Sequence, residues 1–272
     1  MKKSLVLMLA AVMTLSLAAC GEKKEENVTT ATVAAESVAA ETVAAEPAAP
    51  ETTVETTAET AAETVATEAA EEAAVMSYAD FVAADIDAPV CVETYVQAKQ
   101  SWWDNKGTFY TQNEEGAYFL YEMGCTQEEY DQLVPGTKIR VNGFKGEWAG
   151  EVEIVDATFE ILDGNFVAEA QDVTDLLGSD ALAEKQNQFV SFTDMTVEEI
   201  AFKNEQPGDD IYVTLSKDGN NYNFCLEYYL NGSDEEFYNL VSNLEKGATV
   251  DVEGFLYWYE GPNPHITSVT VK

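Results

Sequence analysis

The feature that most constrains the fold of this chain is a segment that occurs twice. Residues 126–144 (TQEEYDQLVPGTKIRVNGF) are echoed by residues 233–241 (SDEEFYNLV) and 246–255 (KGATVDVEGF). Each copy predicts a short capped helix, a glycine stop, and an alternating strand that finishes in Gly-Phe. Internal repetition of this kind indicates repeated structural units. We therefore expect two tandem domains of one small β-rich fold.

The order of the predicted elements is the same in both halves. In the first half we expect strands at 90–98, 107–112, 117–123, 137–144 and 151–161, with a helix capped by Thr126 and Glu129 between the third and fourth. In the second we expect strands at 189–202, 211–215, 222–230, 249–257 and 266–271, with a helix capped by Ser233 and Glu236 in the same place. A phase slip near Val155-Asp156, with a counterpart in the last strand, predicts a bulge in each closing strand.

This order is that of the OB-fold barrel, whose helix lies between strands three and four. The fold class expected is therefore mainly β, with two tandem five-stranded OB-fold barrels that follow a disordered acidic linker. Residues 76–165 are predicted to form the first barrel. Residues 166–272 are predicted to form a linker segment and the second barrel.

The N-terminus predicts export. Lys2-Lys3 precede an apolar run from Leu5 to Leu17, and Leu17-Ala-Ala-Cys20 resembles a bacterial lipobox. We expect residues 1–20 to be a lipoprotein signal peptide, Cys20 to be lipidated (for instance with palmitate), and the chain to be anchored at the extracytoplasmic face of the cell membrane. Residues 21–75, rich in Ala, Glu and Thr, are predicted to form a disordered stalk.

Charge restricts the partners that the sequence predicts. The chain has a formal net charge of −36, and Arg140 is its single arginine. A protein that follows a phosphate backbone needs clustered cations. Nucleic acid and anionic lipid headgroups are therefore expected to be poor partners.

No residue set in the sequence predicts catalysis. The single histidine, His265, is expected to be a surface turn residue, and no catalytic, metal-binding or cofactor motif stands in a supporting context. We expect no enzyme activity, no cofactor and no metal site. Cys91, Cys125 and Cys225 are expected to be small buried hydrophobic residues, with a Cys91–Cys125 bridge as the alternative.

Aromatic residues give the better prediction of a binding site. OB barrels bind ligands on strands two and three and through the loops that join strands 1–2 and 4–5. Candidate ligand-binding residues at those places are Trp102, Trp103, Tyr110, Tyr118, Trp148 and Trp258. The alternative is that these rings close the barrel ends and belong to the core.

The chain resembles OB-fold lipoproteins of anaerobic Gram-positive bacteria that carry anticodon-binding-like OB modules. Residues 90–97 (VCVETYVQ) and 135–143 (PGTKIRVNG) carry the resemblance most clearly. It implies a fold and a location, and no catalytic residues. We expect a monomeric, non-enzymatic binding or adhesion module for a glycan or protein ligand. The alternatives are a structural envelope spacer or scaffold, and a single-stranded nucleic-acid binder.

Overall fold

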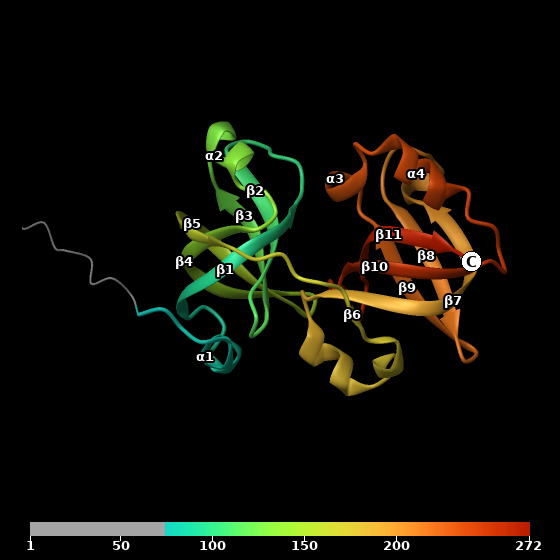
Figure 1. Ribbon diagram of the computed structural model, residues 1–272, viewed down its shortest axis with the longest axis horizontal. Helices are drawn as coiled ribbons and strands as arrows, with labels where there is room; N and C mark the ends of the chain where they lie inside the picture. Colours follow the sequence, from blue (N-terminus) through green and yellow to red (C-terminus); the bar gives the residue numbers. More distant parts are fainter. Residues whose placement is uncertain (1–73) are drawn as a thin grey trace, which may run out of the picture. The chain divides into compact units, whose positions relative to one another are not determined.

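The computed structural model describes residues 74–272, which are mainly β (Figure 1). All of them belong to one of the two units into which the chain divides, Ala66–Lys272. The predicted signal peptide 1–20, its Cys20, and residues 21–73 of the predicted stalk lie outside the described residues. None of the helices in residues 74–272 has the length and apolarity needed to cross a bilayer.

The first five strands close into a barrel in the order β1-β2-β3-β5-β4 (Figure 1). They are β1 (Pro89–Lys99), β2 (Lys106–Gln112), β3 (Ala117–Gly124), β4 (Thr137–Trp148) and β5 (Glu151–Asn165). Helix α2 (Gln127–Gln132) lies between β3 and β4. This is the OB-fold arrangement, so the prediction is confirmed for the first half of the chain.

Local sequence explains the ends of these elements. The amide of Glu129 donates to the hydroxyl of Thr126, and the amide of Thr126 donates to the Glu129 carboxylate, which is the predicted capping box. Helix α1 (Tyr78–Ala83) begins after the N-cap Ser77. The buried Lys145 ammonium donates to the carbonyls of Phe81, Val82 and Ala84 and so satisfies the last turn of α1.

The predicted bulges are present in both closing strands. In β5 the register slips between the pairs Asn142–Thr158 and Phe144–Val155, and Asp156 there has a φ of 49°. The register of the last strand slips between the pairs Glu253–Ser268 and Gly254–Ile266. An extra residue in one strand bends it and increases its twist, as barrel closure requires.

The second half forms a six-stranded sheet rather than the closed five-stranded barrel predicted. Its order is β10-β11-β9-β8-β7-β6, and β7 also pairs with β10. The strands are β6 (Gln171–Asp172), β7 (Phe189–Phe202), β8 (Ile211–Lys217), β9 (Asn220–Leu226), β10 (Thr249–Phe255) and β11 (His265–Val271). The rest of this half consists of short helices and loops. The helices are η1 (Thr174–Leu176), η2 (Asp180–Lys185), η3 (Lys203–Glu205), α3 (Tyr228–Asn231) and α4 (Glu235–Ser242).

Two local predictions in this half are wrong. The strand expected at 222–230 ends at Leu226, because Glu227 caps helix α3 by accepting a hydrogen bond from the amide of Leu230. The cap of α4 is Asp234 rather than Ser233, and its carboxylate accepts from the amide of Phe237 at 2.9 Å. An aspartate caps at least as well as a serine, so the helix starts one residue later than predicted.

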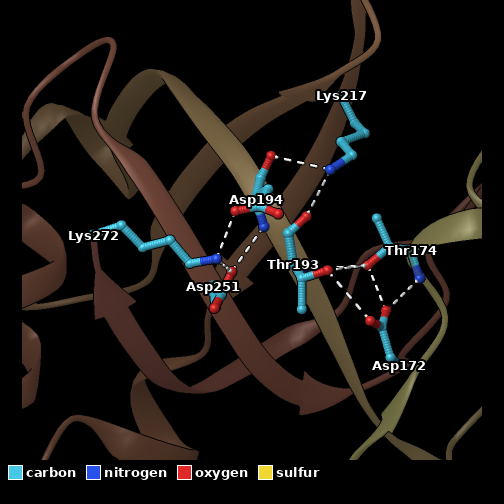
Figure 2. Close-up of polar contacts among 7 residues, drawn as sticks. All are labelled: Asp172, Thr174, Thr193, Asp194, Lys217, Asp251 and Lys272. Carbon is cyan, nitrogen blue, oxygen red and sulfur yellow. Dashed lines mark hydrogen bonds and ion pairs between the residues drawn. The ribbon is translucent and has the colours of Figure 1, made fainter.

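A network of charged side chains fixes the bend in β7 (Figure 2). Asp194, with a φ of 51°, donates its amide to the Asp251 carboxylate, and Lys272 pairs with both carboxylates. Lys217 donates to the carbonyls of Thr193 and Asp194. The register between β7 and β10 slips at this point, so the network supplies partners where the strand pairing is interrupted.

An apolar cluster joins the barrel to the six-stranded sheet. Tyr110 on β2 and Phe119 on β3 stand opposite each other, and both are buried with Phe255 of β10. The Tyr110 and Phe255 rings stack with centroids 4.5 Å apart. The middle of the strand 2–3 face, where OB barrels bind ligands, is therefore covered by the second half of the chain.

Candidate functional site

The uncovered end of the strand 2–3 face forms a groove of about 580 Å³. We call it the tryptophan groove. Its lining comprises Gln100, Ser101, Trp102, Trp103, Lys106, Gly107, Thr108, Tyr121, Glu122, Tyr228 and Tyr229. It combines the loop between β1 and β2, the adjoining ends of β2 and β3, and helix α3.

A tight turn holds Trp103 at the edge of this groove. The amides of Trp103 and Lys106 each donate to the other's carbonyl, at 3.0 and 2.9 Å, and the two residues between them have positive φ. Asp104-Asn105 suits such a turn, because Asp and Asn tolerate the left-handed conformation. The Trp103 side chain is 80% exposed. The turn therefore holds the backbone of Trp103 in place, while its side chain remains exposed to solvent.

Two tyrosines complete the exposed aromatic surface of the groove. Tyr121 on β3 is 45% exposed and Tyr229 on α3 is 58% exposed. The amide of Ser101 donates to the carbonyl of Tyr229 at 2.9 Å, which ties the barrel loop to α3. Trp102 is half-buried, and its indole N–H donates to the Cys125 carbonyl at 3.0 Å. Trp102 therefore supports the groove, and the three exposed rings offer the binding surface.

Two predicted ligand-binding residues are buried, and that part of the prediction is wrong. Tyr110 lies in the cluster between barrel and sheet, and its hydroxyl is 2.6 Å from Nδ1 of His265. Tyr118 packs edge-on against Phe81 in the barrel core, with ring centroids 4.9 Å apart. Burial raises the pKa of Tyr118 to about 12. Neither side chain reaches a ligand in this arrangement.

The other two predicted tryptophans lie away from the tryptophan groove. Trp148, at the end of β4, is 55% exposed and contacts Tyr259 with ring centroids 5.3 Å apart. Trp258 is half-buried over Gly150, where an added Cβ would lie 2.8 Å from the indole ring. Trp148 lines a separate cavity of about 730 Å³, formed mostly by the six-stranded sheet. The predicted tryptophans are thus divided between two surfaces.

Buried titratable groups cluster near the contact between barrel and sheet. His265 is buried rather than on the surface as predicted, and burial lowers its pKa to about 3. Burial raises the pKa of Glu151 to about 8 and that of Glu227 to about 7. Oε2 of Glu151 accepts a hydrogen bond from the amide of Trp258 at 2.8 Å. His265 and Glu151 join the barrel to the sheet through their hydrogen bonds with Tyr110 and Trp258, and none of the three groups lines the tryptophan groove.

Cysteine and metal chemistry have no site in the described region. Cys91, Cys125 and Cys225 are all buried, and Cys125 and Cys225 are free thiols, so the alternative Cys91–Cys125 bridge is not formed. Burial raises the pKa of Cys125 to about 11 and raises that of Cys225 further. Between residues 74 and 272, His, Cys, Asp and Glu side chains form no group of three placed to hold a metal ion.

Comparison with known proteins found no matching family model and no matching curated protein. Solved structures are similar only loosely. A murine DNA-binding protein bound to double-stranded DNA is 10% identical, with 67% of this chain and 96% of that chain covered and a TM-score of 0.35. The Ifi202 HINa domain in complex with 20-bp double-stranded DNA is 13% identical, with 69% and 96% covered and a TM-score of 0.32.

A Replication Protein A heterotrimer bound to single-stranded DNA is also similar. The identity is 11%, with 68% of this chain and 49% of that chain covered and a TM-score of 0.29. These three proteins are bound to DNA, which differs from the glycan or protein ligand expected for this chain and from the expectation that nucleic acid is a poor partner. At these TM-scores the alignments transfer no ligand and no site, so a function must rest on this chain's own residues.

Proposed function

We propose that the tryptophan groove binds single-stranded nucleic acid by stacking its bases on exposed aromatic rings. The observation that carries the proposal is the exposure of Trp103 (80%), Tyr229 (58%) and Tyr121 (45%) in one groove. Stacking of a base on an aromatic side chain contributes on the order of 1–3 kcal/mol and tolerates any base. Duplex DNA hides its base faces, so single strands are the expected ligand.

The position of the groove supports this proposal. OB barrels bind oligonucleotides on the strand 2–3 face and through the loop that joins strands one and two. Tyr110 and Phe119 are buried in the middle of that face, whereas Trp103 and Tyr121 remain open at its end. The available surface is therefore short and accommodates only a few nucleotides.

Charge determines how such binding would work. Among the residues that the structure describes, Lys106 is the one cation in the groove lining, and it pairs with Glu122 at 2.7 Å. The chain as a whole is strongly acidic, with a net charge of −36. Few counterions are released when a strand binds such a surface, so affinity must come from ring stacking rather than from phosphate contacts. We expect weak binding with little salt dependence.

The test is fluorescence anisotropy of a labelled oligothymidylate titrated with the full chain. Trp103→Ala should weaken binding at least about fivefold, since it removes one stacking ring. Trp148→Ala is the matched control, because Trp148 is also an exposed tryptophan but lines the other cavity. Absence of binding by the wild-type chain, or equal losses in the two variants, would overturn the proposal.

Two further features belong to this proposal. We infer that the six-stranded sheet is a second OB module, supported by the β7–β10 pairing, the helix α4 between β9 and β10, and the recurring bulge.

We also infer that the protein is a non-enzymatic lipoprotein anchored outside the cytoplasm through Cys20, supported by the lipobox-like residues 17–20. Loss of metabolic palmitate labelling in Cys20→Ala tests the anchor.

A further inference from the structure

The second cavity, about 730 Å³ in volume, has a different chemistry from the tryptophan groove. It lies on the outer side of β8 and β9 and under the hairpin that follows β10. Its lining includes six aromatic side chains: the largely buried Phe224 and five others, Trp148, Tyr212, Tyr222, Tyr257 and Tyr259. Three of the six are exposed to solvent: Trp148 is 55%, Tyr259 49% and Tyr212 46% exposed. The site is large enough for a small organic molecule.

Carboxylates accompany these rings, and no cation does. Asp210, Glu227 and Glu260 belong to the lining, and within the described part of the chain no lysine or arginine joins them there. Asp210 pairs with Lys203, which stands outside the lining, at 2.9 Å. Glu227 has the backbone amide of Leu230 as its partner, at 2.6 Å, and no cation. Its pKa is raised to about 7, first by burial, and the Asp210 charge adds to the effect.

We propose that this cavity binds an alkylammonium cation, held by the rings of Trp148, Tyr212, Tyr257 and Tyr259 and by the carboxylates of Asp210 and Glu227. The faces of aromatic rings attract cations, tryptophan most strongly, and recognition of ammonium groups by clustered rings is a known use of this effect. The acidic chain also raises the local concentration of cations at its surface. The cavity lining carries carboxylates and neither lysine nor arginine, whereas the lining of the tryptophan groove includes Lys106, and this difference separates the two sites.

The geometry favours an organic ammonium over a bare metal ion. A hard divalent cation needs several oxygen ligands placed together, whereas no group of three His, Cys, Asp or Glu side chains in residues 74–272 is placed that way. Rings dominate the lining, and an alkylammonium buries its methyl or methylene groups against them while its charge meets the carboxylates. The rings of the cavity therefore contact the apolar part of an alkylammonium, and its carboxylates contact the charged part.

Isothermal titration calorimetry of the full chain with tetramethylammonium and with spermidine tests the proposal, and Trp148 gives a fluorescence signal in parallel. We expect at least one of the two to bind in a saturable manner. Saturation with tetramethylammonium alone assigns the site to quaternary ammonium, and saturation with spermidine alone assigns it to primary amines. Absence of saturable binding by both overturns the proposal.

Variants distinguish binding of the cation at this cavity from its general attraction to the negatively charged protein. Trp148→Ala and Tyr259→Ala should each weaken binding by roughly three- to thirtyfold, and Glu227→Gln should weaken it about severalfold. Glu253→Gln is the matched charge control, because Glu253 is an exposed carboxylate on β10 outside the lining. Trp103→Ala is the control for a lost tryptophan. If Glu253→Gln weakens binding as much as Glu227→Gln, the cation is bound by diffuse charge and the site is rejected.

Discussion

The hydroxyl of Tyr110 on β2 lies 2.6 Å from Nδ1 of His265 on β11, and both side chains are buried. This is a hydrogen bond between residues far apart in the chain, inside an apolar cluster. Phe255 stacks on Tyr110 at 4.5 Å between ring centroids, and Tyr257 stacks on His265 at 4.3 Å. The contact between barrel and sheet therefore has a polar pair at its centre and rings on both sides.

Tyr110→Phe should destabilise the protein by about 1–3 kcal/mol, because the imidazole nitrogen of His265 loses its buried partner. Urea denaturation followed by circular dichroism measures the loss. Tyr121→Phe is the control, because it also removes a tyrosine hydroxyl but from a side chain that is 45% exposed. This variant should change the free energy of unfolding by no more than about 0.5 kcal/mol. Equal effects of the two variants would contradict the role given to the pair.

The sequence predicts the first barrel well and the contact between the two sheets poorly. Apolar alternation, the Thr126 capping box and the bulge at Asp156 are local patterns, and all three are present in the structure. Tyr110 and His265 look like a strand surface residue and a turn residue, because the partners that bury them lie far away in the sequence. Tertiary packing, not local pattern, decides their exposure.

The candidate site shows the same division. Trp103 is predicted from the position of its loop, and it is exposed as a ligand-binding residue should be. Tyr229 joins it only because helix α3 interrupts the expected strand after Leu226. Glu227 carries the one available signal, since a carboxylate three residues before Leu230 is a possible cap.

The N-cap of α4 is Asp234 in the structure, whereas the sequence repeat predicts Ser233, and mutations can distinguish the two. Asp234→Ala should cost about 1 kcal/mol of stability, because the amide of Phe237 loses its acceptor. Ser233→Ala, the change at the residue that the repeat predicts as the cap, should have little effect. Thermal or urea unfolding of both variants distinguishes them. A larger loss in Ser233→Ala would restore the predicted capping box.

The contribution of Glu151 to stability should fall as pH rises toward 8. Burial raises the pKa of this carboxyl from 4.5 in the unfolded chain to about 8 in the folded protein. The folded state therefore holds more protons than the unfolded state between these values, and stability decreases as pH rises through that range. At pH 7 the difference amounts to roughly 3 kcal/mol relative to acidic conditions, from about 1.4 kcal/mol per pKa unit.

Glu151→Gln is the matched variant for this effect. Oε1 of Glu151 and Oδ1 of Asn187 are buried and lack hydrogen-bond partners among the described residues, and a glutamine amide supplies the donor that a protonated carboxyl would provide. Denaturation of both proteins between about pH 5 and pH 8 should show a flatter profile for the variant. An unchanged slope would mean that Glu151 is already ionised in the folded protein.

The salt dependence of oligothymidylate binding tests the account's central claim most directly. If exposed rings rather than cations hold the strand, log K plotted against log salt should have a slope no steeper than about −1, since each neutralised phosphate of a single strand contributes about −0.7. Binding that persists with little change from low to physiological salt, and that Trp103→Ala weakens, is the predicted result. No detectable binding, or a slope of roughly −3 or steeper, would contradict it.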